Sequence, residues 1–289
     1  MKKIGFIGLG IMGESMCDRI IQVGKFPCSV FDVDPAKVEK LVEKGGIKAE
    51  SISDIANFAT HIILMVPNDE SVRSVFNSLL PVVKPGTTII DMSTISPNTS
   101  RELALKVQEK GCTMYDAPVV KSKPAAISGD LGIYVGGDKE GLDDIRPILE
   151  CMGKNIIHLG ENGAGLTMKL CHNSLVAEIQ NGVNEMLVLA GHFGISEENF
   201  VKAISYGGGQ NFYLDGKWKA IKERNFSPAF PFEHMAKDIQ LTKNLAETKN
   251  LHLPGIEQVN RIYQEGLRDN LGREDFSASY KVVELKSKQ

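Results

Sequence analysis

The feature that most constrains the fold is a glycine pattern near the amino terminus. Gly8-Leu9-Gly10-Ile11-Met12-Gly13 follows an apolar run at residues 3–7 and precedes an amphipathic stretch at residues 15–23. A Gly-x-Gly-x-x-Gly turn between a strand and a helix is typical of dinucleotide-binding domains. There the first glycine permits a tight turn, the second lets a pyrophosphate approach the backbone, and the third lets the helix pack on the strand. The residues expected to contact the dinucleotide are Gly8, Gly10, Ile11, Met12 and Gly13.

An acidic residue, Asp32, follows the next apolar run at residues 29–31, about 20 residues beyond the last glycine. A carboxylate at this strand end can accept hydrogen bonds from the adenosine ribose, and it repels a 2′-phosphate. The residues that follow, Val33, Asp34 and Pro35, include no arginine that could offset this repulsion. The pattern therefore favours NAD over NADP. The alternative interpretation is that Asp32 stabilises a turn or caps a helix.

Apolar runs rich in β-branched residues recur through the first half of the chain, separated by segments compatible with helices. They lie at residues 3–7, 29–31, 61–66, 87–91, 113–115 and 132–135. This α/β rhythm predicts a parallel sheet covered on both faces, which is a doubly wound Rossmann-type domain. After a glycine cluster at residues 160–165 the strand-like runs end. We therefore expect a dinucleotide-binding domain at residues 1–162 and an all-α substrate and dimerisation domain at residues 163–289.

The second half of the chain has helical periodicity. Apolar residues between positions 166 and 193 have the spacing of one long helix of about 40 Å, which would bridge the two domains. Shorter helices should follow, with breaks at residues 207–209, at Pro228 and Pro231, and at Pro254. Because the long helix is apolar on several faces, we expect a homodimer or homotetramer.

Composition narrows the class of protein. A hydrophobic fraction of 42% and a net charge of −3 are ordinary for a soluble globular chain and give no reason to expect nucleic acid as a partner. The five cysteines form no Cys-x-x-Cys pair, which argues against a disulfide framework and a zinc site and favours the cytoplasm. No apolar run approaches the roughly 20 residues needed to cross a bilayer. We expect no metal, no membrane association and no targeting signal.

A polar pair opens the predicted long helix. Lys169 and Asn173 are four residues apart, which places both side chains on one helical face. A helical lysine is usually a solvated surface residue. A lysine between a cofactor domain and a second domain, however, lies where a cleft is expected. Lys169 and Asn173 are therefore candidates for chemistry.

Taken together, four motifs resemble those of the β-hydroxyacid dehydrogenases, the 3-hydroxyisobutyrate dehydrogenase family, over essentially the whole chain. They are Phe6 to Gly13, Asp116-Ala117-Pro118-Val119, Gly163-Ala164-Gly165 through Lys169 to Asn173, and Lys237-Asp238. The resemblance implies an NAD-dependent oxidoreductase of CH–OH groups, in which Lys169 is the general acid/base and Asn173 orients the substrate. It also implies that Val66, Thr94 and Lys237 contact NAD, with Thr94 near the substrate. Reduction of a carbonyl needs such a positioned proton donor.

The chain departs from the family after Asp-Ala-Pro-Val, where Val120-Lys121-Ser122-Lys123-Pro124 replaces the usual Ser-Gly-Gly. This loop resembles that of the sulfolactaldehyde reductase branch, in which a basic residue and a hydroxyl hold a sulfonate. Lys121 and Ser122 are therefore candidates for binding the anionic head group of the substrate. The alternative is that both are exposed loop residues with no role in binding. His172, where many relatives carry asparagine, either contacts a substrate oxygen or packs between domains. Ser174 is a further substrate-binding candidate.

The expected activity is reduction or oxidation of a short 3-hydroxy acid or its aldehyde with an anionic head, with 3-sulfolactaldehyde favoured. Succinic, methylmalonate and tartronate semialdehydes are alternatives. An imine-reducing relative usually lacks a lysine at position 169, and a non-catalytic NAD-sensing module has no need for Lys169, Asn173 and a charged loop together. A 6-phosphogluconate-type enzyme would have a longer helical domain.

Overall fold

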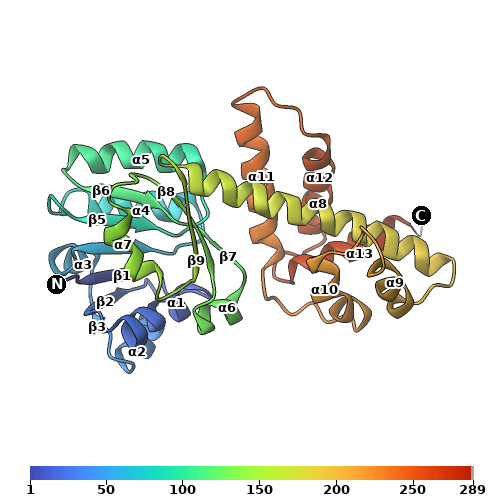
Figure 1. Ribbon diagram of the computed structural model, residues 1–289, viewed down its shortest axis with the longest axis horizontal. Helices are drawn as coiled ribbons and strands as arrows, with labels where there is room; N and C mark the ends of the chain where they lie inside the picture. The colour runs from blue at the N-terminus through green and yellow to red at the C-terminus, as the bar shows by residue number, and fades with distance from the viewer. Residues whose placement is uncertain (288–289) are drawn as a thin grey trace. The chain divides into compact units, whose positions relative to one another are not determined.

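The computed structural model describes residues 1–287, and the chain divides into two compact units, Met1–Lys169 and Leu170–Gln289. The first unit is a sheet with helices packed on it (Figure 1). Its strands are β1 (Ile4–Ile7), β2 (Cys28–Phe31), β3 (Ile47–Lys48), β4 (His61–Leu64), β5 (Thr88–Asp91), β6 (Thr113–Asp116), β7 (Val119–Val120), β8 (Gly132–Gly136) and β9 (Asn155–Gly160). Its helices are α1 (Gly13–Arg19), extended by a π-helical turn (Ile20–Gly24), α2 (Pro35–Val42), α3 (Ile52–Phe58), α4 (Asp69–Leu79), α5 (Pro97–Glu109), α6 (Lys123–Ser128) and α7 (Leu142–Leu149).

The sheet has the strand order β3-β2-β1-β4-β5-β6-β8-β7, with β9 paired to β8. From β3 to β6 all pairs are parallel, and their register aligns Ile7 with Phe31 and with Leu64, and Leu64 with Asp91. The carboxyl ends of these strands therefore lie at one edge of the sheet, where ligands bind in open α/β sheets. The Rossmann-type prediction for this half is confirmed.

The expectation of a purely parallel sheet is wrong at one edge. β8 runs antiparallel to β6 and β7. Only residues 121–131 connect β7 to β8, and α6 occupies six of them. A parallel return needs a crossover of about a dozen residues or more, so this short connection brings the chain back antiparallel. The longer connection through α7 restores a parallel pair between β8 and β9.

The sequence also missed the strands β3, β7 and β9. β3 and β7 are two residues long, and β9 contains Asn155 and His158 and has no fully buried residue. β3 and β7 are too short to show a strand pattern, and β9 lacks the apolar character of a central strand. In contrast, β4 shows why central strands are apolar: Ile63 packs in one core, and Ile62 and Leu64 pack in a second core. Alternating side chains point to opposite faces of a strand, so both faces of this sheet are covered.

The helical half begins with α8 (Ala164–His192), which matches the predicted long helix. The other helices are α9 (Glu197–Ile204), α10 (Phe212–Lys222), α11 (Phe232–Glu247), α12 (Pro254–Arg268) and α13 (Ser279–Lys286), with a short 3-10 turn (Phe276–Ala278) before α13. The breaks before α10, α11 and α12 fall at the predicted glycine and proline positions, whereas the break after α12 was not predicted. One apolar core, which includes Leu187, Phe232 and Tyr263, holds these helices together.

Within residues 1–287 the structure contains no helix of the length and apolarity that a membrane crossing requires. The boundary placed at residue 162 stays a prediction.

Candidate active site

The glycine loop between β1 and α1 has three glycines with different surroundings. Gly8 has φ +96°, a left-handed conformation that L side chains rarely adopt. A methyl group on Gly13 would overlap the carbonyl oxygen of Gly8. A methyl group on Gly10 would meet no atom within 4 Å. Gly8 and Gly13 are thus required by the fold, whereas Gly10 leaves open space at the start of α1, as a bound pyrophosphate requires.

The neighbours of this loop agree with a dinucleotide site. No side chain makes a capping hydrogen bond at Met12, so no side-chain cap competes with a phosphate for the N–H groups of the first turn of α1. Ile11 is half exposed. The residues present therefore fit a dinucleotide phosphate, and Ile11 and Met12 lie on the loop that would hold it.

Asp32 at the end of β2 is joined to the glycine loop. Its Oδ2 accepts a hydrogen bond from the Leu9 N–H at 2.6 Å, and its Oδ1 accepts one from the Asp34 N–H at 2.9 Å. Lys37 Nζ lies 3.7 Å from Oδ1. Each carboxylate oxygen has a second lone pair, so Asp32 can still accept from ribose hydroxyls. The residue that caps α2 is Asp34, whose side chain accepts from the Ala36 N–H at 3.0 Å, so helix capping does not account for Asp32.

The exits of β4 and β5 are linked by Ser93, a residue that the sequence did not single out. The Val66 N–H donates to Ser93 Oγ at 3.0 Å, and the Ser93 N–H donates to Asp91 Oδ1 at 3.0 Å. Asp91 is fully buried, and this burial raises the pKa of its carboxyl to about 7. Val66 and the half-buried Thr94 are thereby held on two adjacent strand exits. The signal for this link was the Asp-x-Ser spacing, which on its own is common in turns.

The amino terminus of α8 is fixed by Asp116 at the end of β6. Its carboxylate accepts hydrogen bonds from the Gly163 N–H at 2.6 Å and the Leu166 N–H at 2.8 Å. Burial raises the pKa of Asp116, and these two N–H groups oppose that rise. A methyl group on Gly165 would overlap the carbonyl oxygen of Tyr134. The Gly-Ala-Gly motif therefore lets α8 start directly against the sheet, which determines where Lys169 falls.

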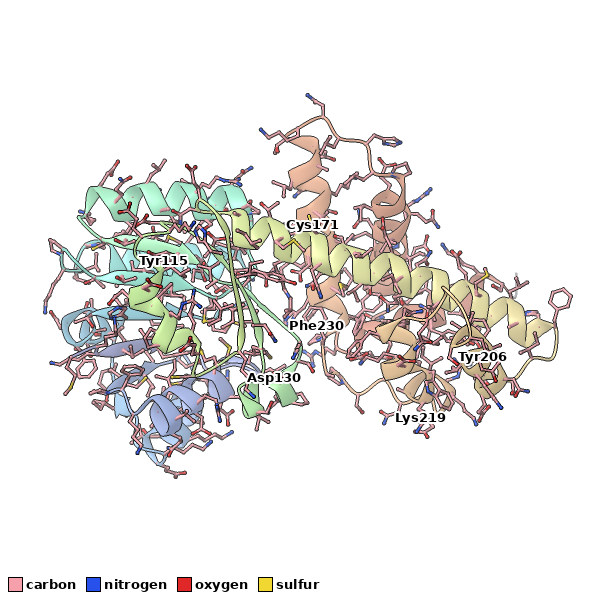
Figure 2. The ribbon with its side chains drawn as sticks, in the orientation of Figure 1. Tyr115, Asp130, Cys171, Tyr206, Lys219 and Phe230 are labelled. Carbon is pink, nitrogen blue, oxygen red and sulfur yellow. The ribbon has the colours of Figure 1, made fainter. Side chains whose placement is uncertain are left out.

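Lys169 and Asn173 lie one turn apart on α8, and both are buried, at 8% and 5% exposure. Lysine is almost never buried unless it has a partner or a function. Asn173 Nδ2 donates to Asp238 Oδ2 at 2.6 Å, and His172 Nδ1 lies 3.2 Å from Asn173 Oδ1. The intervening Cys171 is exposed (Figure 2). Lys169 and Asn173 thus share a face of α8 that Cys171 does not.

In the sequence, Asp238 was noted only as part of the Lys237-Asp238 motif. In the structure it lies on α11 and contacts two candidate site residues. It is 2% exposed, and its Oδ1 lies 3.0 Å from Lys237 Nζ. It therefore contacts both Asn173 and Lys237. Ser174, in contrast, donates to Thr242 Oγ1 at 2.7 Å and is 4% exposed. Its hydroxyl is used in packing α8 on α11.

The loop after β7 differs from a simple cationic loop. Lys121 has φ +77°, and its Nζ pairs with Asp130 Oδ2 at 2.5 Å. Ser122 is the N-cap residue of α6, but its hydroxyl makes no capping hydrogen bond. Asp130 lies where α6 ends and β8 is about to begin (Figure 2). The positive charge of Lys121 is therefore offset by a carboxylate. Across residues 1–287 no group of three or more His, Cys, Asp or Glu side chains could hold a metal ion.

Two family models match nearly the whole chain. The NAD-binding domain of 6-phosphogluconate dehydrogenase matches residues 3–160. The model described as the NAD-binding of NADP-dependent 3-hydroxyisobutyrate dehydrogenase matches residues 163–283.

Individual proteins agree with this assignment. The chain is 32% identical to an NAD-dependent L-serine dehydrogenase of Pseudomonas aeruginosa, with 98% of both chains covered. It is 33% identical to the 2-(hydroxymethyl)glutarate dehydrogenase of Eubacterium barkeri, over 98% of this chain and 95% of that one. Among solved structures, 3-hydroxyisobutyrate dehydrogenase of Mycobacterium tuberculosis with L-serine has a TM-score of 0.91 at 29% identity, with 98% of this chain and 99% of that chain covered. The chain therefore belongs to the β-hydroxyacid dehydrogenase family and is an NAD-dependent oxidoreductase.

Proposed function

We propose that the protein interconverts a short 3-hydroxy acid, or the equivalent alcohol, and its aldehyde, with Lys169 as the general acid/base. The observation that carries this proposal is the burial of Lys169 one turn before the buried Asn173, whose amide is held by Asp238. A surface lysine would not be buried, and a module that only senses NAD has no use for this arrangement. Both residues lie on a rigid helix, which suits positioned proton transfer.

The chemistry follows from what these side chains can donate and accept. NAD supplies the hydride in its reduced form and accepts it in its oxidised form. As the hydride reaches the carbonyl carbon, the C=O π bond breaks, and the carbonyl oxygen takes a proton from the Lys169 ammonium. Lys169 is left neutral and regains a proton from solvent. In the reverse direction neutral Lys169 takes the hydroxyl proton. Asn173 can hold the substrate oxygen without competing for that proton.

For the other site residues we propose the roles that the sequence assigned. Gly8, Gly10, Ile11, Met12, Gly13, Asp32, Val66, Thr94 and Lys237 contact NAD, and Thr94, Lys121, Ser122 and His172 contact the substrate. The buried Ser174–Thr242 hydrogen bond makes Ser174 the weakest of the candidates. Asp32 should give a strong preference for NADH over NADPH, and equal rates with the two would contradict its role at the ribose.

We propose 3-sulfolactaldehyde as the first candidate substrate, because Lys121 and the uncapped Ser122 hydroxyl lie together in the loop that departs from the family pattern. A carboxylate semialdehyde is the second candidate. Two observations favour it: Asp130 already offsets the Lys121 charge, and the related L-serine and 2-(hydroxymethyl)glutarate dehydrogenases are named for carboxylate substrates. A panel of 3-sulfolactaldehyde and the succinic, methylmalonate and tartronate semialdehydes, assayed with NADH, should rank the two head groups. Reduction of uncharged aldehydes only would contradict an anionic substrate.

The role of Lys169 is tested by Lys169→Ala, with Lys169→Arg as the charge-matched variant. Loss of a general acid should lower kcat by about 10²- to 10⁴-fold. Arginine keeps the charge but does not release its proton, so it should not restore turnover. NADH affinity, measured by fluorescence titration, should stay near that of the wild type in both variants. Turnover retained by Lys169→Ala would exclude this mechanism.

We also propose that the protein is a homodimer or homotetramer. Met186, Leu189 and Phe193 are between 47% and 79% exposed near the carboxyl end of α8. Large apolar side chains gathered on one surface are typical of subunit contacts. Light scattering after size-exclusion chromatography would measure the assembly, and a monomer at micromolar concentration would contradict it.

A further inference from the structure

Lys121 is the one left-handed non-glycine residue of residues 1–287 that does not follow a helix. The other four, Lys25, Arg224, Asn250 and Asn270, lie within three residues of a helix end, where left-handed residues are common. Lys121 instead follows the strand β7. A lysine in this conformation is less stable than a glycine would be. Such an outlier points to a function for the side chain that only the lysine can serve.

The side chain of Lys121 is held by one partner. Its Nζ lies 2.5 Å from Asp130 Oδ2, and both side chains are nearly half exposed, at 44% and 46%. The pairing follows from the fold, because Val120 opposes Gly132 in the β7–β8 pair and so brings residues 121 and 130 to the same end of that pair. The Lys121 ammonium holds the pKa of Asp130 below its usual range, so Asp130 is ionised at neutral pH.

The Lys121–Asp130 ion pair changes the hydrogen-bond donors and the charge with which the loop can bind an anion. A lysine ammonium has three donor hydrogens, and one of them is used by Asp130. The remaining donors can still hold a sulfonate or carboxylate oxygen. The Asp130 carboxylate, however, offsets the charge of Lys121 and repels negative charge brought close to it. That repulsion grows with the charge of the incoming group, and a phosphate monoester carries about −1.5 to −2 at pH 7.

We propose that Asp130 is a specificity-determining residue: paired with Lys121, it lets the loop accept a singly charged sulfonate or carboxylate and disfavours a doubly charged phosphate monoester. The inference rests on the proposed function, which places the substrate's head group at this loop. Discrimination of this kind can combine a repulsive element with an attractive one. Lys121 supplies the attraction and Asp130 supplies the repulsion.

The test is Asp130→Asn, which keeps the shape of the side chain and removes its charge. The two substrates are 3-sulfolactaldehyde and glyceraldehyde 3-phosphate, which differ in the charge of the head group and in one bridging oxygen, so each ratio is compared between protein variants. The ratio of kcat/KM for the phosphate to that for the sulfonate should rise about fivefold in the variant, the size expected for one exposed charge interaction. The rise should shrink in high salt, because screening weakens the repulsion.

Three further variants separate the effect of the Asp130 charge from effects of a changed structure. Asp143→Asn removes an equally negative but almost fully exposed carboxylate from α7, and it should leave the ratio unchanged. Asp130→Glu keeps the charge and should keep the wild-type ratio. Lys121→Ala should weaken the binding of both head groups, because the cation that both use is gone. An unchanged ratio in Asp130→Asn, or the same rise in Asp143→Asn, would overturn the inference.

Binding measurements keep this inference separate from the proposed reaction. Calorimetric titration of the NADH-loaded protein with 2,3-dihydroxypropane-1-sulfonate and with glycerol 3-phosphate needs no turnover. If the wild type reduces neither aldehyde, 3-sulfolactaldehyde is not its substrate, and the ratio of the two dissociation constants decides the role of Asp130. Asp130→Asn should shift that ratio toward glycerol 3-phosphate. An unshifted ratio, or no binding of either compound, would refute the role of Asp130.

Discussion

Among the loops of the first unit that place a residue in the left-handed region, the loop after β1 and the loop after β7 use opposite residue types. Gly8, after β1, has φ +96°, and Lys121, after β7, has φ +77°. Gly8 is glycine, the residue that adopts this backbone conformation most easily. At Lys121 the conformation is kept despite the side chain. In the first loop the residue type is explained by the backbone conformation, whereas in the second loop a particular side chain is kept against it. Substitutions at the glycines of the first loop and at Lys121 test this difference.

The largest effect is expected for Gly13→Ala, because its methyl group would overlap the backbone oxygen of Gly8. Backbone atoms cannot move aside as a flexible side chain can, so the variant should lose about 1–3 kcal/mol or more in free energy of unfolding. NADH binding should weaken with it. Urea denaturation measures the first quantity and fluorescence titration the second. Wild-type stability in Gly13→Ala would mean that the third glycine is not needed for helix packing.

A smaller effect, and on binding alone, is expected for Gly10→Ala. Its methyl group meets no protein atom within 4 Å, so the free energy of unfolding should change by less than about 0.5 kcal/mol. The same methyl group would occupy the space proposed for the pyrophosphate, so NADH affinity should fall at least about tenfold, or about 1.4 kcal/mol. A variant that binds NADH as tightly as the wild type would place the pyrophosphate elsewhere. Gly10→Ala and Gly13→Ala together separate a glycine needed for the ligand from one needed for the fold.

The sequence predicted the strand and helix around the glycine loop because each of their signals is local. The order of a strand, three glycines, a helix and an acid at the next strand end is contained in about 30 residues, a single βαβ unit. The run at residues 132–135 predicted β8 as a strand, but its antiparallel direction was missed, because direction depends on the length of a connection and not on the composition of the strand. Periodicity reports which residues are buried, and it does not report in which direction a strand returns.

The residues of the candidate site also divide into those whose signals are local in the sequence and those whose partners are set by the fold. Lys169 and Asn173 were found together because four residues along a helix fix their shared face. Asp238 and Asp130 were given no role because their partners are distant in sequence or set by strand pairing: Asn173 lies 65 residues from Asp238, and Lys121 lies 9 residues from Asp130. A lysine in a loop is counted as a positive charge when only the sequence is read. The structure shows that this charge is offset by a neighbouring carboxylate.

The smallest effect tests the strain at Lys121 itself, by comparing Lys121→Gly with Lys121→Ala. Both variants lose the ion pair with Asp130, so the difference between them reports the backbone alone. At a position with negative φ, alanine would be the more stable by about 0.4–1 kcal/mol, because glycine has more freedom in the unfolded chain. At φ +77° the order should reverse, with Lys121→Gly the more stable by up to about 1 kcal/mol, since only glycine adopts this conformation without steric conflict. Parallel urea denaturation of the two variants measures the difference. If Lys121→Ala is at least as stable as Lys121→Gly, the backbone of Lys121 is not strained, and the contrast with Gly8 fails.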